Sequence, residues 1–247
     1  MTNTFLPPHF TSPLPTDRQN KNSTKQELIC YTVIMNEINQ NSILLFHGSQ
    51  NGLEDCIKPI SRDLCDFGKG FYMGTEETQP LTLICNYPEA VLYKLELQTS
   101  NLNIREIPLG IDWALFVAFN RGRLTKELAP KLYEKYESYK NSVDIFKGFI
   151  ANDRMFVVLD RFFDGDITDK ALTESLSALK LGVQYVAVTQ KACDAIKILS
   201  EKKLIDFERT KLKTQSELNR KAGVSLADEM CRKYRREGLY FDELIRE

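Results

Sequence analysis

The pattern of apolar and polar residues along the chain changes near residue 43. Up to about residue 26 the chain is rich in Pro, Asn, Ser and Thr, a composition that buries too little apolar surface to offset the entropy of ordering. Beyond residue 43, short apolar runs bounded by glycine or polar residues predict buried strands. These runs cover residues 43–47, 70–74, 90–97, 143–151 and 183–189. We therefore expect a flexible N-terminal segment, residues 1–41, that precedes a globular domain.

Between these runs, apolar residues recur at helical spacing. The helical patterns cover residues 109–119, 130–139, 152–163 and 168–180, and a short one runs from a cap at Thr78 to just before Pro88. Gly182 stands where a C-cap would end the fourth helix. Strands and helices follow no regular βαβ rhythm, and no G-x-G-x-x-G motif opens a helix after a strand. The sequence therefore predicts a mixed α+β domain rather than a Rossmann fold.

The C-terminal part of the chain has a different composition. After Leu199 the sequence becomes dense in Lys and Arg as far as Arg236, a pattern typical of the solvated face of a helix. Gly238 would end such a helix and leave an apolar cluster beyond it that must find a surface. That cluster consists of Leu239, Tyr240, Phe241, Leu244 and Ile245. We expect residues 200–247 to be a basic helical extension of a domain that covers residues 42–199.

Within this extension, one helical stripe is apolar. The stripe consists of Leu226, Met230 and Tyr234. Ser225 and Asp228 have the spacing of a capping box just before it. The stripe is suited to a partner helix. Nucleic-acid binding by the basic residues is the weaker hypothesis, because Phe207 is the only aromatic residue among them before Tyr234.

Composition and charge exclude several classes of protein. The 247 residues, 43% of them hydrophobic, suffice for one enzyme-sized domain with appendages. With 33 basic and 34 acidic residues, no overall charge draws the molecule to nucleic acid or to an anionic membrane. No apolar run approaches the roughly 20 residues that span a bilayer, and the N-terminus lacks the regions of a signal peptide. These features predict a soluble, cytoplasmic protein, whose translation starts at Met1 or Met35.

The cysteines and histidines show no metal-binding pattern. The six cysteines include no CxxC pair, and the two histidines, His9 and His47, lie far apart in the sequence. Scattered thiols suit a reducing cytosol better than a disulfide-stapled secreted fold. We expect no zinc cluster.

Two short motifs carry the candidate chemistry. In FHGS, residues 46–49, the imidazole of His47 stands beside a residue without a side chain, so a flat ligand could lie against the main chain of Gly48. In FGKGFYMG, residues 67–74, glycines flank an aromatic pair and present Tyr72 as a stacking face. An amide such as that of nicotinamide fits the first motif, whereas the spacing of these glycines resembles no phosphate loop.

Each of these residues also has a structural interpretation. A single histidine at a strand end usually has its hydrogen bonds satisfied there, and GFYMG alone is typical of a core strand. Asn152 and Asp153 could cap the helix that follows them, and Gln184 could be satisfied within the sheet. The order of the motifs favours a joint function: His-Gly-Ser on a first strand, a glycine-bounded tyrosine on the next, and Gln-Tyr-Val on a late one.

The motifs resemble those of a known enzyme group. FHGS followed by FGKGFYMG is similar to the histidine and tyrosine motifs of the ADP-ribosyltransferase branch that includes diphtheria toxin and poly(ADP-ribose) polymerases, whose signature is His, Tyr and Glu on three strands. Residues 43–198 resemble more closely the bacterial family called domain of unknown function 3990, which is grouped with these transferases. Residues 151–156, ANDRMF, and 181–186, LGVQYV, also look like that family's.

The resemblance implies an ADP-ribosyltransferase-like fold that binds NAD without a metal. It implies that His47 holds a ribose hydroxyl, that Gly48 binds the nicotinamide amide through its main chain, and that Tyr72 covers one face of the nicotinamide. Ser49 belongs to the same NAD-binding motif. Tyr87 resembles the second stacking tyrosine, at a longer distance from Tyr72 than is usual.

Gln184 departs from the family pattern, because it stands where the wider branch has its catalytic glutamate. A carboxylate would stabilise the positive charge that grows as nicotinamide leaves, whereas glutamine keeps the hydrogen bond and lacks the charge. Another carboxylate could assist instead, with Asp153 the first candidate and Asp144 the second. Catalysis is therefore weakened, relocated or absent.

Three hypotheses about function remain open. The chain is a mono-ADP-ribosyltransferase that acts on an unidentified acceptor, an enzyme that cleaves NAD without transfer, or a binding module for NAD or ADP-ribose without catalysis. Relatives of this kind resemble the toxins of bacterial toxin–antitoxin pairs, which implies a neutralising antitoxin protein as a partner.

Overall fold

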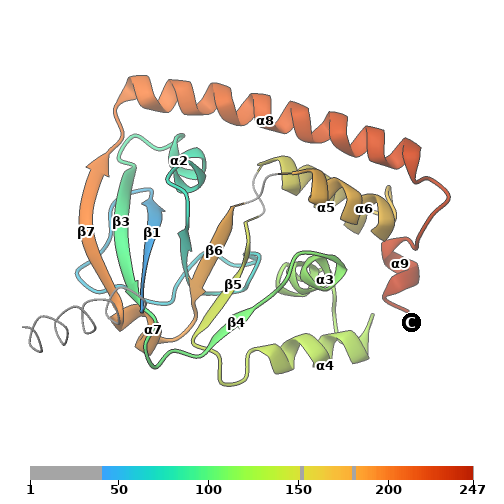
Figure 1. Cartoon of the computed structure of the whole chain (residues 1–247), viewed down its shortest axis with the longest axis horizontal. Coiled ribbons are helices and arrows are strands. Elements are labelled where there is room, and N and C mark those ends of the chain that lie inside the picture. Colours follow the sequence, from blue (N-terminus) through green and yellow to red (C-terminus); the bar gives the residue numbers. More distant parts are fainter. Residues whose placement is uncertain (1–40, 151–152, 180–181, 247) are drawn as a thin grey trace, which may run out of the picture. The chain divides into compact units, whose positions relative to one another are not determined.

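A mixed β-sheet runs through the domain (Figure 1). The computed structural model describes residues 41–150, 153–179 and 182–246, except the side chains of residues 153 and 154. In these residues seven strands form one sheet in the order β4-β5-β6-β2-β1-β3-β7. They are β1 (Ser42–Ser49), β2 (Phe71–Gly74), β3 (Val91–Gln98), β4 (Ile104–Glu106), β5 (Ile145–Phe149), β6 (Val183–Ala187) and β7 (Ile196–Lys203). Only β4 and β5 pair in parallel within this part of the chain, and the predicted α+β class is confirmed.

The sheet is almost divided between β1 and β2. β1 pairs with β3 along its whole length, and β2 pairs with β6 along its whole length. Between β1 and β2, in contrast, the described residues make a single pair, Phe46 opposite Gly74. The ladder of main-chain hydrogen bonds is therefore interrupted beside the C-terminal half of β1, where His47 and Gly48 lie.

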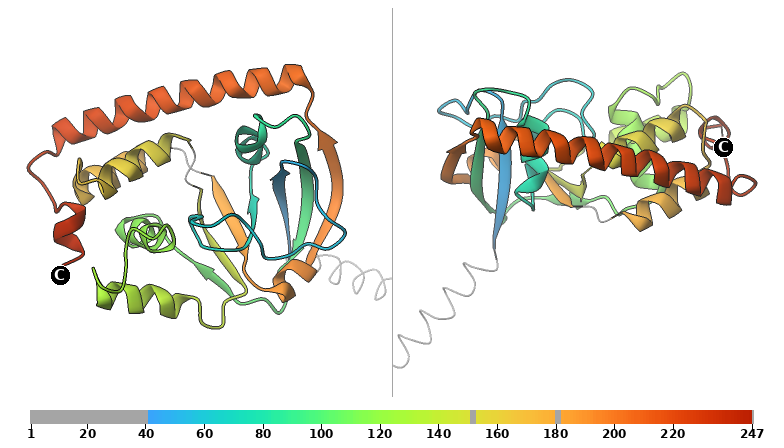
Figure 2. Two further views of the ribbon diagram at one scale, coloured as in Figure 1. Left: turned by 180° about the vertical axis from the view of Figure 1, so that it is seen from behind. Right: turned by 90° about the horizontal axis from the view of Figure 1, so that it is seen from above.

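Helices cover the sheet unevenly (Figures 1 and 2). They are α2 (Thr78–Ile84), α3 (Ile111–Asn120), α4 (Pro130–Tyr139), α5 (Asp153–Phe163), α6 (Asp169–Ala178), α7 (Gln190–Asp194), α8 (Asp206–Lys233) and α9 (Phe241–Leu244). The helices α3 to α6 enclose the largest apolar core, beside β4, β5 and β6. Fully buried Trp113, Phe116, Tyr136 and Phe162 belong to this core. On the other side of the division, α2 packs against β1.

The basic extension is part of the same compact unit, residues 42–247. α8 passes α2 and then runs along α5 and α6 (Figure 2). Met230 and Tyr234 pack against the main core, and Asp228 forms an ion pair with Arg161 of α5. The helix that the apolar stripe was expected to bind is thus found within the chain itself.

The residues that follow α8 complete the main core. Gly238 does not end α8 as predicted, because the helix stops at Lys233; Gly238 lies in the connection that follows, with a φ of +83°. Phe241 of α9 then packs edge-on against Phe162 and Phe163, with ring centroids 5.4 and 5.5 Å apart. Ile245 is buried beside it. The apolar cluster at the C-terminus therefore finds its surface on α5.

Three other predicted helix caps are wrong. Thr78 is the first residue of α2 rather than its cap, because the preceding Glu77 already adopts helical dihedral angles. α6 ends at Ala178 with an extended residue after it, before Gly182 is reached. Ser225 lies inside α8, where its hydroxyl donates to the carbonyl of Lys221. In each case the residue type suits a cap, but the helix begins or ends at another position.

Strand β7 was not predicted, and it crosses the boundary expected between residues 199 and 200. It lies at the edge of the sheet, and all its residues after Ile196 are exposed. An exposed edge strand lacks the apolar alternation by which a sequence reveals a half-buried strand. The helical extension therefore begins at Asp206 rather than at residue 200.

Residues 1–40, which include most of the segment expected to be flexible, lie outside the described residues. In the part of the chain that is described, no helix combines the length and the apolar character needed to cross a membrane.

Candidate functional site

A cavity of about 730 Å³ lies where β1 and β2 separate, a volume typical of a small-molecule site. Its walls come from β1, β2, α2, α5 and β6, from residues 61–66 and from the residues that follow α3. Five residues singled out in the sequence line it together: His47, Gly48, Tyr72, Tyr87 and Gln184. These residues are distant in sequence, so the fold itself assembles the site.

His47 is bound to the main chain of the neighbouring strand. Its Nδ1 atom lies 2.7 Å from the carbonyl oxygen of Tyr72, and its ring stacks on Phe71 with centroids 4.2 Å apart. Because a carbonyl oxygen only accepts, Nδ1 must carry the proton. Burial lowers the pKa of His47, although the hydrogen bond to Tyr72 opposes this effect. The imidazole is therefore neutral at neutral pH, with Nε2 as an acceptor.

Tyr72 holds the segment that precedes β2. Its hydroxyl donates to the carbonyl of Gly68 at 2.7 Å and accepts from the N–H of Phe67 at 3.0 Å. Gly68 has a φ of +78°, a left-handed conformation that favours glycine, which accounts for one glycine of the motif. Burial raises the pKa of Tyr72. The phenol therefore stays neutral, and its ring is fixed in the cavity wall.

Gly48 is needed for a reason that the sequence did not reveal. A Cβ atom at this position would lie 2.9 Å from Cγ2 of Ile84 and 3.0 Å from the carbonyl oxygen of Pro80. Both residues belong to α2, so the missing side chain lets this helix approach β1 closely. The absence of a side chain at Gly48 therefore serves the packing of α2, and Gly48 also lines the cavity. The contact of a flat ligand with its main chain stays a prediction.

Gln184 presents an acceptor in the cavity wall. It is 4% exposed and lies in β6 opposite Gly74 of β2. Its Nε2 donates to the carbonyl of Phe149 at 3.0 Å, and this bond sets the orientation of the amide. Among the described residues, Oε1 has no hydrogen-bond partner, so the side chain offers a neutral acceptor where a catalytic carboxylate would offer a charged one.

Tyr87 lines the cavity, whereas Ser49 does not. Tyr87 follows α2, is 37% exposed and lines the cavity; its role as a stacking tyrosine stays a prediction. Ser49 is not among the cavity residues, and its hydroxyl donates to the carbonyl of Gly52 at 2.5 Å. The turn after β1 thus uses the hydroxyl of Ser49, and the expected role of Ser49 in binding a ligand stays a prediction that this placement does not support.

The two candidate replacements for the catalytic glutamate do not gain support. Asp144 is not among the cavity residues, and its carboxylate accepts from the N–H of Asn103, from Thr189 and from Lys191. The hydrogen bond from Asn103, followed by that from Lys191, holds the pKa of Asp144 below its usual range. Asp144 therefore joins α7 to the edge of the sheet. Asp153 begins α5, but its side chain lies outside the described residues.

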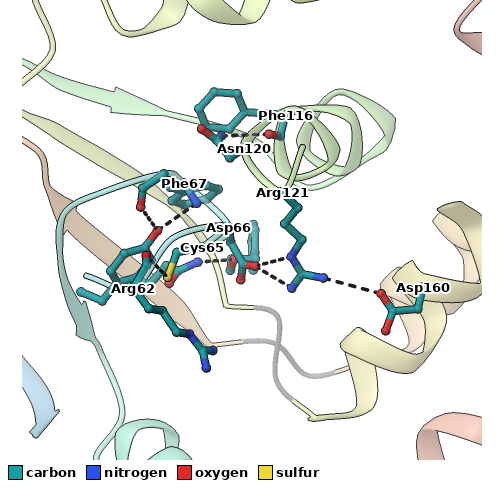
Figure 3. A network of polar contacts seen from close by, with 12 residues as sticks. Arg62, Cys65, Asp66, Phe67, Phe116, Asn120, Arg121 and Asp160 are labelled. Atoms are coloured by element: carbon teal, nitrogen blue, oxygen red, sulfur yellow. Dashed lines mark hydrogen bonds and ion pairs between the residues drawn. The ribbon is translucent and has the colours of Figure 1, made fainter. Parts of the chain in front are cut away.

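The structure adds a charged network that sequence reasoning missed (Figure 3). Arg121, directly after α3, contacts Asp66 through Nε at 2.9 Å and Nη2 at 2.6 Å. Its Nη1 lies 3.8 Å from Asp160 of α5, and its guanidinium covers the ring of Phe156 at 4.3 Å. All four residues line the cavity. Only Asp66 carried a signal, because it directly precedes the FGKGFYMG motif.

The geometry of the described residues includes no group of three or more His, Cys, Asp or Glu side chains that could hold a metal ion. The cavity is lined instead by neutral acceptors, by aromatic rings and by charged residues, which include the network around Arg121 as well as Arg62, Asp63 and Arg123. Such a surface is suited to an organic ligand with hydroxyl groups and a flat ring.

Residues 43–198 match the sequence profile of a family described as protein of unknown function, DUF3990. The chain belongs to this family. No curated protein and no solved structure matches the chain.

The DUF3990 segment contains the whole cavity. It extends from β1 to the first residues of β7, and every residue that lines the cavity falls within it. α8 and α9 follow the matched segment. The site is thus a property of the DUF3990 domain, and the extension supports that domain from outside.

Proposed function

We propose that this DUF3990 protein binds NAD in the cavity and transfers ADP-ribose from it to an acceptor. One observation carries the proposal: His47, Tyr72, Tyr87 and Gln184, which the motif resemblance selects from separate segments, line a single cavity. If the resemblance were due to chance, we would not expect these four side chains to line the same cavity. The acceptor, and an antitoxin that would neutralise the protein, remain parts of the proposal that come from resemblance alone.

The acceptors and aromatic rings of the cavity suit the ribose and the nicotinamide of NAD. Nε2 of His47 and Oε1 of Gln184 are neutral acceptors, and each would take a hydrogen bond from a ribose hydroxyl. The rings of Tyr72 and Tyr87 would offer faces for a flat heterocycle. Gly48, with its main chain in the cavity wall, would contribute N–H or C=O groups to the amide of nicotinamide.

Gln184 also limits the rate that we expect for the transfer of ADP-ribose. As the bond between nicotinamide and ribose breaks, positive charge grows on the sugar, and a nearby carboxylate would stabilise it strongly. Gln184 contributes only the dipole of its amide. We therefore propose a slow transferase, in which the acceptor or another carboxylate assists.

The same observation supports a second candidate, a module that binds NAD or ADP-ribose without turnover. Gln184 is buried and its amide is held by Phe149, so the position of the missing carboxylate is well ordered and uncharged. In such a module, Gln184→Glu would create NAD cleavage where the natural protein has none.

Calorimetric titration with NAD, followed by measurement of released nicotinamide in the same sample over hours, tests both candidates. Binding with release supports the transferase or a hydrolase, and binding without release supports the module. The informative variant is Tyr87→Ala, because Tyr87 is partly exposed and its loss spares the fold. Phe207→Ala is the matched control, since Phe207 is 76% exposed on α8 and is not a cavity residue. If neither the natural protein nor the control binds NAD, the transferase is wrong, and if they also fail to bind ADP-ribose, both candidates are wrong.

A further inference from the structure

The turn between α2 and β3 carries Tyr87, which lines the cavity. The N–H of Tyr87 donates to the carbonyl of Ile84, the last residue of α2, at 3.0 Å, so the residue is held on its N-terminal side. The next residue is Pro88, whose ring fixes its own φ and disfavours the helical region for the residue before it. The direction of the Tyr87 side chain is therefore set by the main chain on both sides.

Residues beyond the DUF3990 match hold the C-terminal side of this turn. Nη1 of Arg209, in α8, donates to the carbonyl of Pro88 at 2.6 Å. The N–H of Leu204, a buried residue, donates to the carbonyl of Ala90 at 3.0 Å. Because the matched segment ends at residue 198, both donors belong to the C-terminal extension.

Arg209 makes a stronger contact with the turn than Lys203 does. Lys203 lies 3.5 Å from the carboxylate of Glu89, but the two side chains are 77% and 71% exposed, and such surface pairs contribute little. The side chain of Arg209 is 19% exposed, and its Nη2 pairs with Asp206, three residues earlier in α8. This pair orients the guanidinium, so that its charged Nη1 donor is held against the carbonyl of Pro88.

The first turns of α8, which carry Arg209, are themselves fixed against the cavity wall. Leu212, three residues after Arg209, packs on a buried cluster that includes Ile84 of α2 and Leu92 of β3. This part of α8 lies next to α2 (Figure 1). Arg209 therefore ties the turn to a packed helix.

We infer that Arg209 is a positioning residue for Tyr87: it holds the carbonyl of Pro88 and thereby keeps the ring of Tyr87 in the cavity wall. Without this hydrogen bond, the carbonyl turns to water and the turn gains other arrangements, so the ring spends part of its time away from the wall. The consequence for NAD rests on the proposed function, in which Tyr87 offers a face to a flat heterocycle. Arg209 does not line the cavity, so the extension acts on the site without touching the ligand.

Fluorine NMR tests the positioning without any ligand. The full chain is labelled with 3-fluorotyrosine, and the resonance of Tyr87 is assigned from its absence in Tyr87→Phe. Arg209→Ala is expected to move this resonance toward the position of free fluorotyrosine, because a released ring is surrounded by water. The resonance of Tyr136, which is fully buried in the main core, should stay in place and show that the fold is intact. An unchanged Tyr87 resonance would overturn the inference.

Calorimetry measures the consequence for NAD. Arg209→Ala is expected to lower the affinity by about fivefold, because the ligand must then order a loosened side chain. Arg209→Lys keeps a charged donor for Pro88 and should restore most of the loss. In a protein that carries Tyr87→Ala, the further change Arg209→Ala should have no effect, since no ring remains to be positioned. An equal loss in both backgrounds would mean a general loosening of the fold and would overturn the inference.

Lys213→Ala is the matched control. Lys213 lies one turn beyond Arg209 in α8, has the same charge, and has an exposed side chain with no hydrogen bond or ion pair among the described residues. It should change neither the resonance of Tyr87 nor the affinity, and an effect equal to that of Arg209→Ala would contradict a specific role for Arg209. If the natural protein binds no NAD but its Tyr87 resonance responds to Arg209→Ala alone, the proposed transferase is wrong and the positioning stands.

Discussion

The Nδ1 atom of His47 lies 2.7 Å from the carbonyl oxygen of Tyr72, across the line where β1 and β2 stop pairing. A side chain thus replaces the main-chain hydrogen bond that a continuous sheet would have at this point. The replacement has two effects. It satisfies the carbonyl of Tyr72 at an interrupted ladder, and it fixes the tautomer in which Nε2 is free to accept a hydrogen bond.

We expect His47→Asn to separate these two effects. The amide nitrogen of asparagine can take the place of Nδ1 and donate to Tyr72, but asparagine has no atom in the place of Nε2. The free energy of unfolding should therefore change little, while the affinity for NAD falls by about 1 kcal/mol, the value of one hydrogen bond. Urea unfolding and calorimetry measure the two quantities. A variant that loses stability and keeps its affinity would show that His47 has only a structural role.

His47 also predicts how stability depends on pH. Burial lowers its pKa in the folded protein, so below about pH 6.5 the unfolded chain takes up a proton that the folded protein does not. The contribution of His47 to stability is complete above that pH and is lost as the pH falls toward the lowered pKa. The melting temperature of the natural protein should decrease from pH 7.5 to pH 5.5 more than that of His47→Asn. An equal decrease in the two proteins would contradict this, because their carboxylates and His9 are the same.

Gly48→Ala should destabilise the domain by about 1–3 kcal/mol, because the added methyl group would overlap α2. The nearest atom is Cγ2 of Ile84, at 2.9 Å from the new carbon. Ile84→Ala removes that atom, so the two substitutions together should cost less than the sum of their separate costs. Urea unfolding of the two single variants and the double variant measures the coupling, expected to exceed about 0.5 kcal/mol. Simple additivity would mean that the helix does not rest on Gly48.

The sequence predicted those parts of the fold whose pattern is local. Residues 130–139 were predicted as a helix and form α4 (Pro130–Tyr139), because proline marks its first turn and the helical spacing is clear. The two glycine motifs could likewise be recognised from the sequence, because each places glycines beside a histidine or a tyrosine within a few residues. What could be read from the sequence is thus composition and spacing within one element.

The missing parts depend on contacts between distant elements. β7 is a strand only because β3 offers it an edge, and its exposed residues show no period of two. Arg121 and Asp66 are far apart in the sequence, and neither neighbourhood indicates that an ion pair joins them. The stripe on α8 was correctly seen as apolar, but spacing alone cannot say whether the helix that it meets belongs to the same chain.

The C-terminal extension supplies the last prediction. Phe241 is 6% exposed and packs on Phe162 and Phe163, so Phe241→Ala should cost about 3–5 kcal/mol of the free energy of unfolding. Phe207→Ala, on the exposed part of α8, should change it by less than about 0.5 kcal/mol. Both residues lie beyond the segment that matches the DUF3990 profile. Urea unfolding of the two variants therefore distinguishes an extension that completes the core from an appended tail, and equal small costs would favour the tail.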